Sequence, residues 1–115
     1  MLEIVEKPWG HYTVFYDDKK NIKVKELYVL PEKSLSMQKH FKRAEEWFVA
    51  EGFATVWTSN DYDGVNILQG IFRKFEKLTI PKGTWHRLEN QASIPLKIIE
   101  IQYGDECSEE DIIRK

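Results

Sequence analysis

The amino-acid sequence predicts a single all-β domain, a sandwich or a barrel, and three observations support this prediction. Short runs rich in Val, Ile, Thr and aromatic residues alternate with turn signals about every ten residues, which is typical of such folds. The 115 residues include 4 Trp, 5 Tyr and 6 Phe, and aromatic side chains favour strands. Because no repeat, low-complexity tract or Pro/Gly/Ser-rich linker divides the chain, residues 1–115 are expected to form one domain.

The strands are expected between these turn signals. Asp17 and Asp18 end the first strand, Pro31 ends the second, and Glu51 with Gly52 marks a tight hairpin. Further turns are expected at Asp63–Gly64, Gln69–Gly70 and 81–83. The expected strands are residues 11–16, 22–30, 34–40, 45–50, 53–58, 72–80, 85–90 and 95–103.

The C-terminal segment is the one place where a helix is predicted. Ser108 precedes three acidic residues, and this pattern is typical of a helix N-terminus. We expect a short C-terminal helix of one or two turns, lying against the barrel through Ile112 and Ile113.

Charge and cysteine content exclude several classes of protein. The net charge is −2, with 17 basic and 19 acidic residues interspersed, so no nucleic-acid partner is expected. The single cysteine, Cys107, excludes an intramolecular disulfide and fits a reducing compartment. There is no apolar run long enough to span a membrane and no signal-peptide pattern. We therefore expect a cytoplasmic protein with no membrane partner.

Residues 34–52 contain a candidate metal site. Gln38 and His40 have the same parity on one expected strand, Glu45 begins the next, and His86 follows the turn at 81–83. One amide oxygen, one carboxylate and two imidazoles suit Zn²⁺, Fe²⁺, Mn²⁺, Co²⁺ or Ni²⁺, and the residue types alone do not choose among these ions. Each residue taken singly also fits a packing or surface role, and Glu45 with Glu46 could be a solvated acidic pair.

The spacing of these residues resembles the two motifs of the cupin superfamily. The first motif, G(X)5HXH(X)3–4E(X)6G, is matched at Gln38, His40, Glu45 and Gly52, with Glu32 in place of the opening glycine. The second, G(X)5PXG(X)2H(X)3N, is matched at Pro81, Gly83, His86 and Asn90, with Phe75 in place of its glycine.

Further segments resemble the cupin domain of type II mannose-6-phosphate isomerases, which opens with Arg-Pro-Trp-Gly-x-Tyr. They are residues 7–12, 23–25, 35–38, 43–47, 86–90, 99–102 and 110–114. The resemblance implies a jelly-roll-like double-sheet fold. It also implies one divalent metal, usually zinc, bound by Gln38, His40, Glu45 and His86.

The sequence departs from that family in three respects. Glu46 stands where the family usually has His, and residues 59–70 look longer than the corresponding hairpin. The nucleotidyltransferase domain that is often fused to this cupin domain has no counterpart, since no Gly-rich phosphate loop is present. Guanylyl transfer is therefore not expected of this chain.

The resemblance implies interconversion of mannose 6-phosphate and fructose 6-phosphate, which needs a base at C2 and a cationic phosphate contact. Glu100 is a candidate base, or alternatively a carboxylate that orients one of the histidines. Lys25 has inward parity and could assist the base, contact the phosphate, or extend along a sheet edge into solvent. Arg43 is expected at the barrel mouth between two ligands, and Arg87 and Arg114 are weaker candidates.

Three classes of function remain open. The first is a sugar-phosphate isomerase of mannose and polysaccharide metabolism. The second is a non-catalytic metal- and sugar-binding module, which the Glu46 departure favours. The third is an iron-dependent oxygenase. The expected partner is a small sugar phosphate, and a homodimer is predicted because an exposed sheet edge would need cover.

Overall fold

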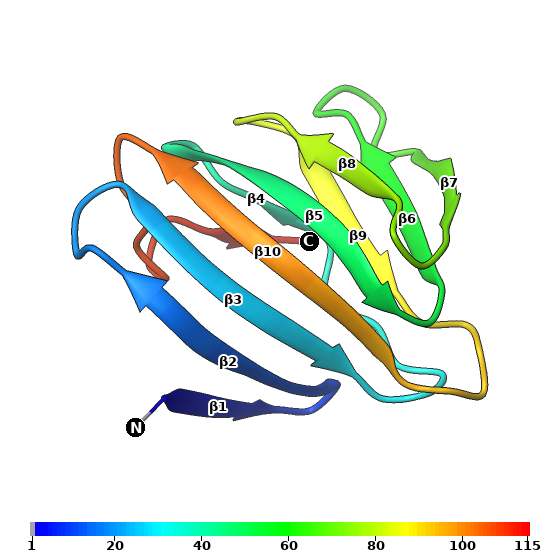
Figure 1. Ribbon diagram of the computed structural model, residues 1–115. Coiled ribbons are helices and arrows are strands. Elements are labelled where there is room, and N and C mark those ends of the chain that lie inside the picture. Colours follow the sequence, from blue (N-terminus) through cyan, green and yellow to red (C-terminus); the bar gives the residue numbers. More distant parts are fainter. Residues whose placement is uncertain (1) are drawn as a thin grey trace.

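The computed structural model describes residues 2–115, which form two antiparallel sheets packed face to face (Figure 1). One sheet has six strands in the order β1-β2-β3-β10-β5-β8, and the other has five in the order β11-β4-β9-β6-β7. The strands are β1 Glu3–Lys7, β2 Gly10–Asp17, β3 Ile22–Val29, β4 Gln38–Lys39, β5 Arg43–Glu51, β6 Ala54–Ser59, β7 Asn66–Phe72, β8 Lys77–Ile80, β9 Trp85–Glu89, β10 Leu96–Gly104 and β11 Ile113–Arg114. The predicted all-β double-sheet fold is thereby confirmed.

The hydrophobic core follows the two-residue alternation of the central strands. Leu27, Ile98 and Val49 lie side by side across β3, β10 and β5, and all three are buried. Val56 and Leu88 reach the same cluster from the opposite sheet. Full burial of such a side chain stabilises the fold by about 1.5–3 kcal/mol, so this end of the barrel holds the two sheets together.

Toward the other end of the same three strands, the inward face becomes polar. Two successive inward rows cross β3, β10 and β5: Lys25–Glu100–Trp47, then Lys23–Gln102–Glu45. All six side chains are buried. Burying charged groups costs free energy unless they are paired, so these rows indicate a binding or catalytic site.

Some strands differ from the sequence prediction. The predicted strand 72–80 is divided by a turn at residues 73–76, where Phe75 has φ 75°. In the predicted strand 34–40, only Gln38–Lys39 and an isolated bridge at Ser34 pair with neighbours. The turn expected at Gln69–Gly70 lies within β7, where a register irregularity skips Gln69 and the neighbouring Gly70 has φ 151°. Neither β1 nor β7 was predicted.

The two missing motif glycines correspond to strained backbone. Glu32 has φ 62° and Phe75 has φ 75°, and these are the positions at which the cupin motifs carry glycine. Residues with a Cβ rarely adopt this left-handed conformation. The chain therefore keeps the turn geometry of both motifs although it has lost the residue that accommodates it most readily.

The predicted C-terminal helix is wrong, because residues 2–115 as described contain no helix. Residues 105–112, called here the C-terminal strap, are irregular apart from turns and bends and lead into β11, which pairs with β4. The Asp111 carboxylate accepts hydrogen bonds from the backbone N–H groups of Phe41 and Lys42 at 3.0 and 2.8 Å. These long-range bonds replace the local ones of a helix. No helix in the described range could cross a membrane.

Candidate metal centre

Three buried side chains from both sheets converge on one point. The ligand atoms of His40, Glu45 and His86 all lie within 4.8 Å of one another. His40 Nε2 is 3.4 Å from Glu45 Oε2, and His86 Nε2 is 3.7 Å from Glu45 Oε1. Metal–ligand distances of about 2.0–2.2 Å place two ligands of one ion roughly 3–4 Å apart. The two distances from Glu45 to the histidines therefore fit a divalent cation.

Backbone carbonyls set the orientation of both imidazoles. His40 Nδ1 is 2.7 Å from the carbonyl oxygen of Asp111, and His86 Nδ1 is 2.8 Å from that of Thr84. Because a carbonyl only accepts hydrogen bonds, each Nδ1 must carry the proton and each Nε2 presents its lone pair toward Glu45. Metal-binding histidines are commonly oriented in this way.

Gln38 is placed where it could supply a fourth ligand. It lies directly opposite His86 in the β4–β9 pair and lines the same cavity. Its Nε2 donates to the hydroxyl of Ser36 at 3.2 Å. An amide oxygen beside two imidazoles and a carboxylate completes the mixed nitrogen and oxygen donor set proposed from the sequence.

Arg43 lies between two candidate ligands. It is the first residue of β5 and is buried beside the histidines. Its Nε donates to Glu45 Oε2 at 3.1 Å, and Nη2 donates to His40 Nε2 at 3.3 Å. Nη1 donates to the carbonyl of Ser108 at 3.0 Å. The guanidinium therefore holds two candidate ligands and the strap, and it would have to release His40 Nε2 to a bound cation.

Glu100 is a second buried carboxylate next to this group. Trp47 Nε1 donates to both Glu45 Oε1 and Glu100 Oε2 at 3.1 Å, and Gln102 Nε2 donates to Glu100 Oε1 at 2.8 Å. The Nδ1 atoms of both histidines are already bonded to backbone carbonyls. Glu100 is thus fixed by Trp47 and Gln102, and these bonds favour the base role over the role of orienting a histidine.

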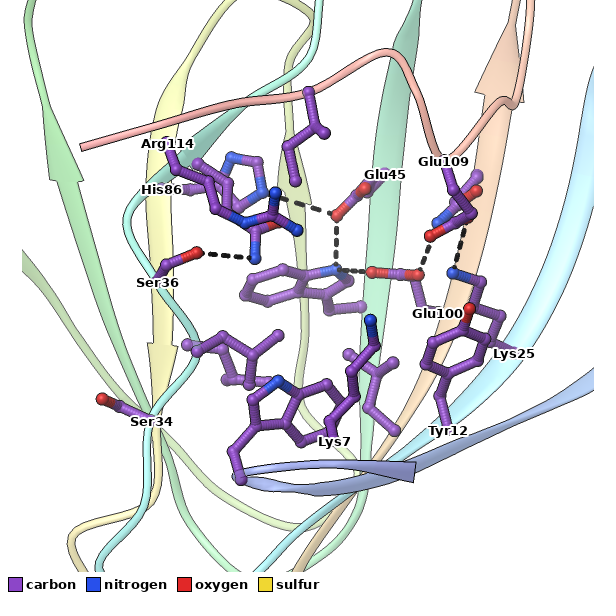
Figure 2. Close-up of a pocket in the computed structure, with 18 of the residues that line it drawn as sticks. Lys7, Tyr12, Lys25, Ser34, Ser36, Glu45, His86, Glu100, Glu109 and Arg114 are labelled. Atoms are coloured by element: carbon purple, nitrogen blue, oxygen red, sulfur yellow. Dashed lines mark hydrogen bonds and ion pairs between the residues drawn. The ribbon is translucent and has the colours of Figure 1, made fainter. Parts of the chain in front are cut away.

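A cavity of about 400 Å³ is lined by three of the candidate ligands, Gln38, Glu45 and His86, and by Glu100. Figure 2 shows Glu45, Glu100 and Lys25 in succession along one side, with His86 on the other. Pockets of about 300–1,000 Å³ hold small organic ligands. The cavity therefore has room for a sugar-sized molecule in contact with the candidate ligands.

The two remaining arginine candidates from the sequence differ in their position relative to the cavity. The Arg87 guanidinium carbon is 5.6 Å from the Trp57 ring centroid, which places it on the opposite face of β9 from His86. Arg114 lines the cavity from β11, and its side chain is exposed. Glu46 alternates with Glu45 and points away from the site. The Glu46 departure from the family pattern therefore does not alter the ligand set.

Burial dominates the electrostatics of the site. It lowers the pKa of His40 to about 4, with a further contribution from the Arg43 charge, and it lowers the pKa of His86. Burial and the neighbouring Glu45 raise the pKa of Glu100 to about 7. Neutral imidazoles at neutral pH are the form that binds a metal.

These shifts predict how the stability of EDTA-treated protein depends on pH. Neutral His40, with a pKa lowered from 6.5 to about 4, makes the free energy of unfolding increase as pH rises through this interval. Glu100, with a pKa raised from 4.5 to about 7, makes it decrease over an overlapping interval. Glu100→Gln removes the second effect and, by removing the Glu100 charge, lowers the pKa of His40 further. Between pH 4.5 and 6.5, the stability of this variant should therefore rise relative to wild type by up to about 1.4 kcal/mol per pH unit. Urea unfolding measured across this range checks the prediction, and parallel profiles would contradict it.

Several residues that build the site were not predicted from the sequence. Lys23 has the same parity as Lys25 and Leu27, so strand alternation could have identified it. Trp47 has the parity of Glu45, which indicates an indole N–H beside the carboxylate. Glu109 and Asp111 reach the site through contacts with distant segments, which carry no local sequence signal.

Comparisons with known proteins identify the family of this chain. The family model described as mannose-6-phosphate isomerase, C-terminal, matches residues 1–115. The chain is 40% identical over 108 residues to a mannose-1-phosphate guanylyltransferase of Sinorhizobium fredii, covering 94% of this chain and 20% of the relative. It is 37% identical over 110 residues to the xanthan biosynthesis protein XanB of Xanthomonas campestris, covering 96% and 22%. The chain thus spans about a fifth of the length of these relatives.

Solved structures with low sequence identity share the fold. The capsular polysaccharide assembling protein CapF of Staphylococcus aureus superposes with a TM-score of 0.82 at 18% identity, covering 99% of this chain and 32% of CapF. An oxalate decarboxylase of Lactobacillus farciminis gives a TM-score of 0.80 at 20% identity, covering 98% and 33%. Because the family model matches residues 1–115, the chain is a cupin domain that belongs to the mannose-6-phosphate isomerase C-terminal family.

Proposed function

We propose that this chain is a metal-dependent aldose–ketose isomerase that interconverts mannose 6-phosphate and fructose 6-phosphate. The observation that carries the proposal is the position of Glu100: a buried, hydrogen-bonded carboxylate beside the His40, Glu45 and His86 group, inside a ligand-sized cavity. The family match supports the same class of substrate.

The reaction moves a proton between C1 and C2 of an open-chain sugar and builds up negative charge on the two oxygens. A divalent cation held by His40, Glu45 and His86, with Gln38, would stabilise that charge as a Lewis acid. Zinc suits this donor set, and manganese, iron, cobalt and nickel remain compatible with it.

The chain's own residues would position and transfer the proton. Glu100 takes the proton from C2 and returns it at C1, while the hydroxyl proton passes from O2 to O1. Trp47 and Gln102 hold the Glu100 carboxylate in one orientation. Arg43 is a positioning residue, because it holds Glu45 and His40 by hydrogen bonds. Lys25, opposite Glu100 on the neighbouring strand, places a positive charge close to the base. The buried floor of the cavity limits the access of water.

A spectrophotometric assay of fructose 6-phosphate formed from mannose 6-phosphate tests the proposal. We expect turnover by the zinc-, manganese- or cobalt-loaded chain. The His86→Ala variant should lose both the bound cation and the turnover. His11→Ala is a matched control, because His11 stacks on Tyr28 outside the site. A folded, metal-loaded chain that turns over neither this substrate nor another hexose phosphate would contradict the proposal and support the non-catalytic sugar-binding module.

A further inference from the structure

A pair of buried lysines on β3 lies at the side of the cavity away from the histidines. Lys23 and Lys25 are 8% and 3% exposed, and both point inward from the same face of the strand. Their Nζ atoms lie 3.2 and 2.9 Å from one oxygen, Glu109 Oε2. Asp17 Oδ2 is 3.8 Å from Lys23 Nζ, and the Lys25 Nζ is 4.0 Å from the centroid of the Tyr12 ring. Two buried ammonium groups thus share one carboxylate oxygen.

Glu109 belongs to the C-terminal strap, which is bonded to the rest of the domain by Ser108 before it and by Asp111 after it. The strap is bonded to the domain at Ser108, whose carbonyl accepts from Arg43, and at Asp111, whose carboxylate accepts from two backbone N–H groups. The Glu109 side chain is 47% exposed, and the two lysines are its ion-pair partners. Figure 2 shows Glu109 reaching down from the strap toward Lys25. Its carboxylate can therefore leave the lysines without unfolding of the strap.

The spacing of this pair from the metal centre suits a sugar phosphate. Lys23, Gln102 and Glu45 form one row across β3, β10 and β5, so the Cα atoms of Lys23 and Glu45 lie two strand spacings, about 10 Å, apart. Lys25, in the neighbouring row, lines the same cavity as Glu45, and so does Glu109, which is the ion-pair partner of both lysines. The carbonyl end of an open-chain hexose phosphate at the histidines would therefore leave its phosphate end on the lysine side of the cavity.

We infer that Lys23 and Lys25 form the anion subsite of this cavity, that it takes the phosphate monoester of the ligand, and that Glu109 competes for it. The inference rests on the proposed function, of which it specifies the phosphate contact. A phosphate monoester carries nearly two negative charges and three acceptor oxygens, so it can pair with each ammonium through a separate oxygen. The single carboxylate oxygen of Glu109 cannot do so.

Calorimetric titration of EDTA-treated protein with inorganic phosphate, at constant ionic strength, tests the competition. Glu109→Gln keeps the size of the side chain and removes its charge, and it should raise phosphate affinity by at least about fivefold, a coupling typical of interacting binding events. Glu110→Gln, an exposed neighbour in the same strap, makes the same change in net charge and should leave the affinity near that of wild type. Lys25→Met should abolish the gain when combined with Glu109→Gln, with folding checked by circular dichroism.

Equal phosphate affinity in wild type, Glu109→Gln and Glu110→Gln would overturn the inference, as would an equal increase in both variants. The result is independent of turnover. If phosphate affinity rises only in Glu109→Gln while no hexose phosphate is isomerised, the subsite stands and the proposed isomerase activity fails. If isomerase activity is present but Glu109→Gln changes neither phosphate affinity nor the KM for mannose 6-phosphate, the subsite alone fails.

Discussion

Replacing Glu45 with glutamine is expected to lower the affinity of the chain for a divalent cation and to destabilise the metal-free protein. Glu45 lies within reach of both histidines and also accepts hydrogen bonds from Arg43 and Trp47. Losing the one anionic ligand should weaken metal binding by more than the roughly 10- to 100-fold typical of losing an outer partner. It also leaves the Arg43 guanidinium buried without its carboxylate, which typically costs about 3–5 kcal/mol.

A double variant separates the two effects. Glu45→Gln with Arg43→Met removes the unpaired buried cation as well, so it should recover much of the lost stability without recovering metal affinity. Glu46→Gln is the matched control for metal binding, because the neighbouring carboxylate points to the opposite face of β5. Metal titration and urea unfolding of the four proteins measure both quantities. Unchanged metal affinity in Glu45→Gln would show that the cation is held elsewhere.

Replacing Glu100 with glutamine is expected to lower kcat for hexose phosphate isomerisation by about 10²- to 10⁴-fold, the usual contribution of general acid–base catalysis. The substitution keeps the shape of a side chain held by Trp47 and Gln102, and it leaves the three candidate ligands in place. Metal content should therefore match wild type, and KM should change little by comparison. Initial rates over a range of mannose 6-phosphate concentrations, with metal analysis of the same samples, provide the measurement.

Glu26→Gln serves as the control for this experiment. Glu26 lies on β3 next to Lys25 with the opposite parity, so its side chain is outside the cavity. This variant should retain full activity. If Glu100→Gln kept kcat within a few-fold of wild type, Glu100 would not be the base. The proton transfer would then need another group of the cavity wall.

Strand alternation explains why much of the site could be predicted from the sequence. Glu45, Lys25 and Glu100 each have the parity of neighbouring apolar residues that face the core, and the structure buries all three. The positions of His40 and His86 required the motif resemblance, because no local pattern brings residues that lie 46 positions apart in sequence together. The centroids of their rings lie 5.1 Å apart in the folded chain.

The conformation of the C-terminal strap could not be predicted from the sequence, because it depends on contacts with distant parts of the chain. The acidic run after Ser108 fits a helix N-terminus by composition, yet Glu109 and Asp111 bond to β3 and to the segment before β5 instead. Two backbone carbonyls of the strap also bond to the site. The carbonyl of Asp111 orients His40, and the carbonyl of Ser108 accepts a hydrogen bond from Arg43. Propensity describes a segment in isolation, and here tertiary hydrogen bonds to buried groups outweigh it.

We propose that His40, Glu45 and His86, with Gln38, hold one divalent cation next to the cavity. This proposal can be tested by titrating EDTA-treated protein with Co²⁺, followed by visible absorption and by native mass spectrometry. We expect one ion per chain with the spectrum of a mixed nitrogen and oxygen site, lost in His40→Ala and in His86→Ala and retained in His11→Ala. A folded chain that binds no ion, or one that binds it equally well in the His40 and His86 variants, would contradict it.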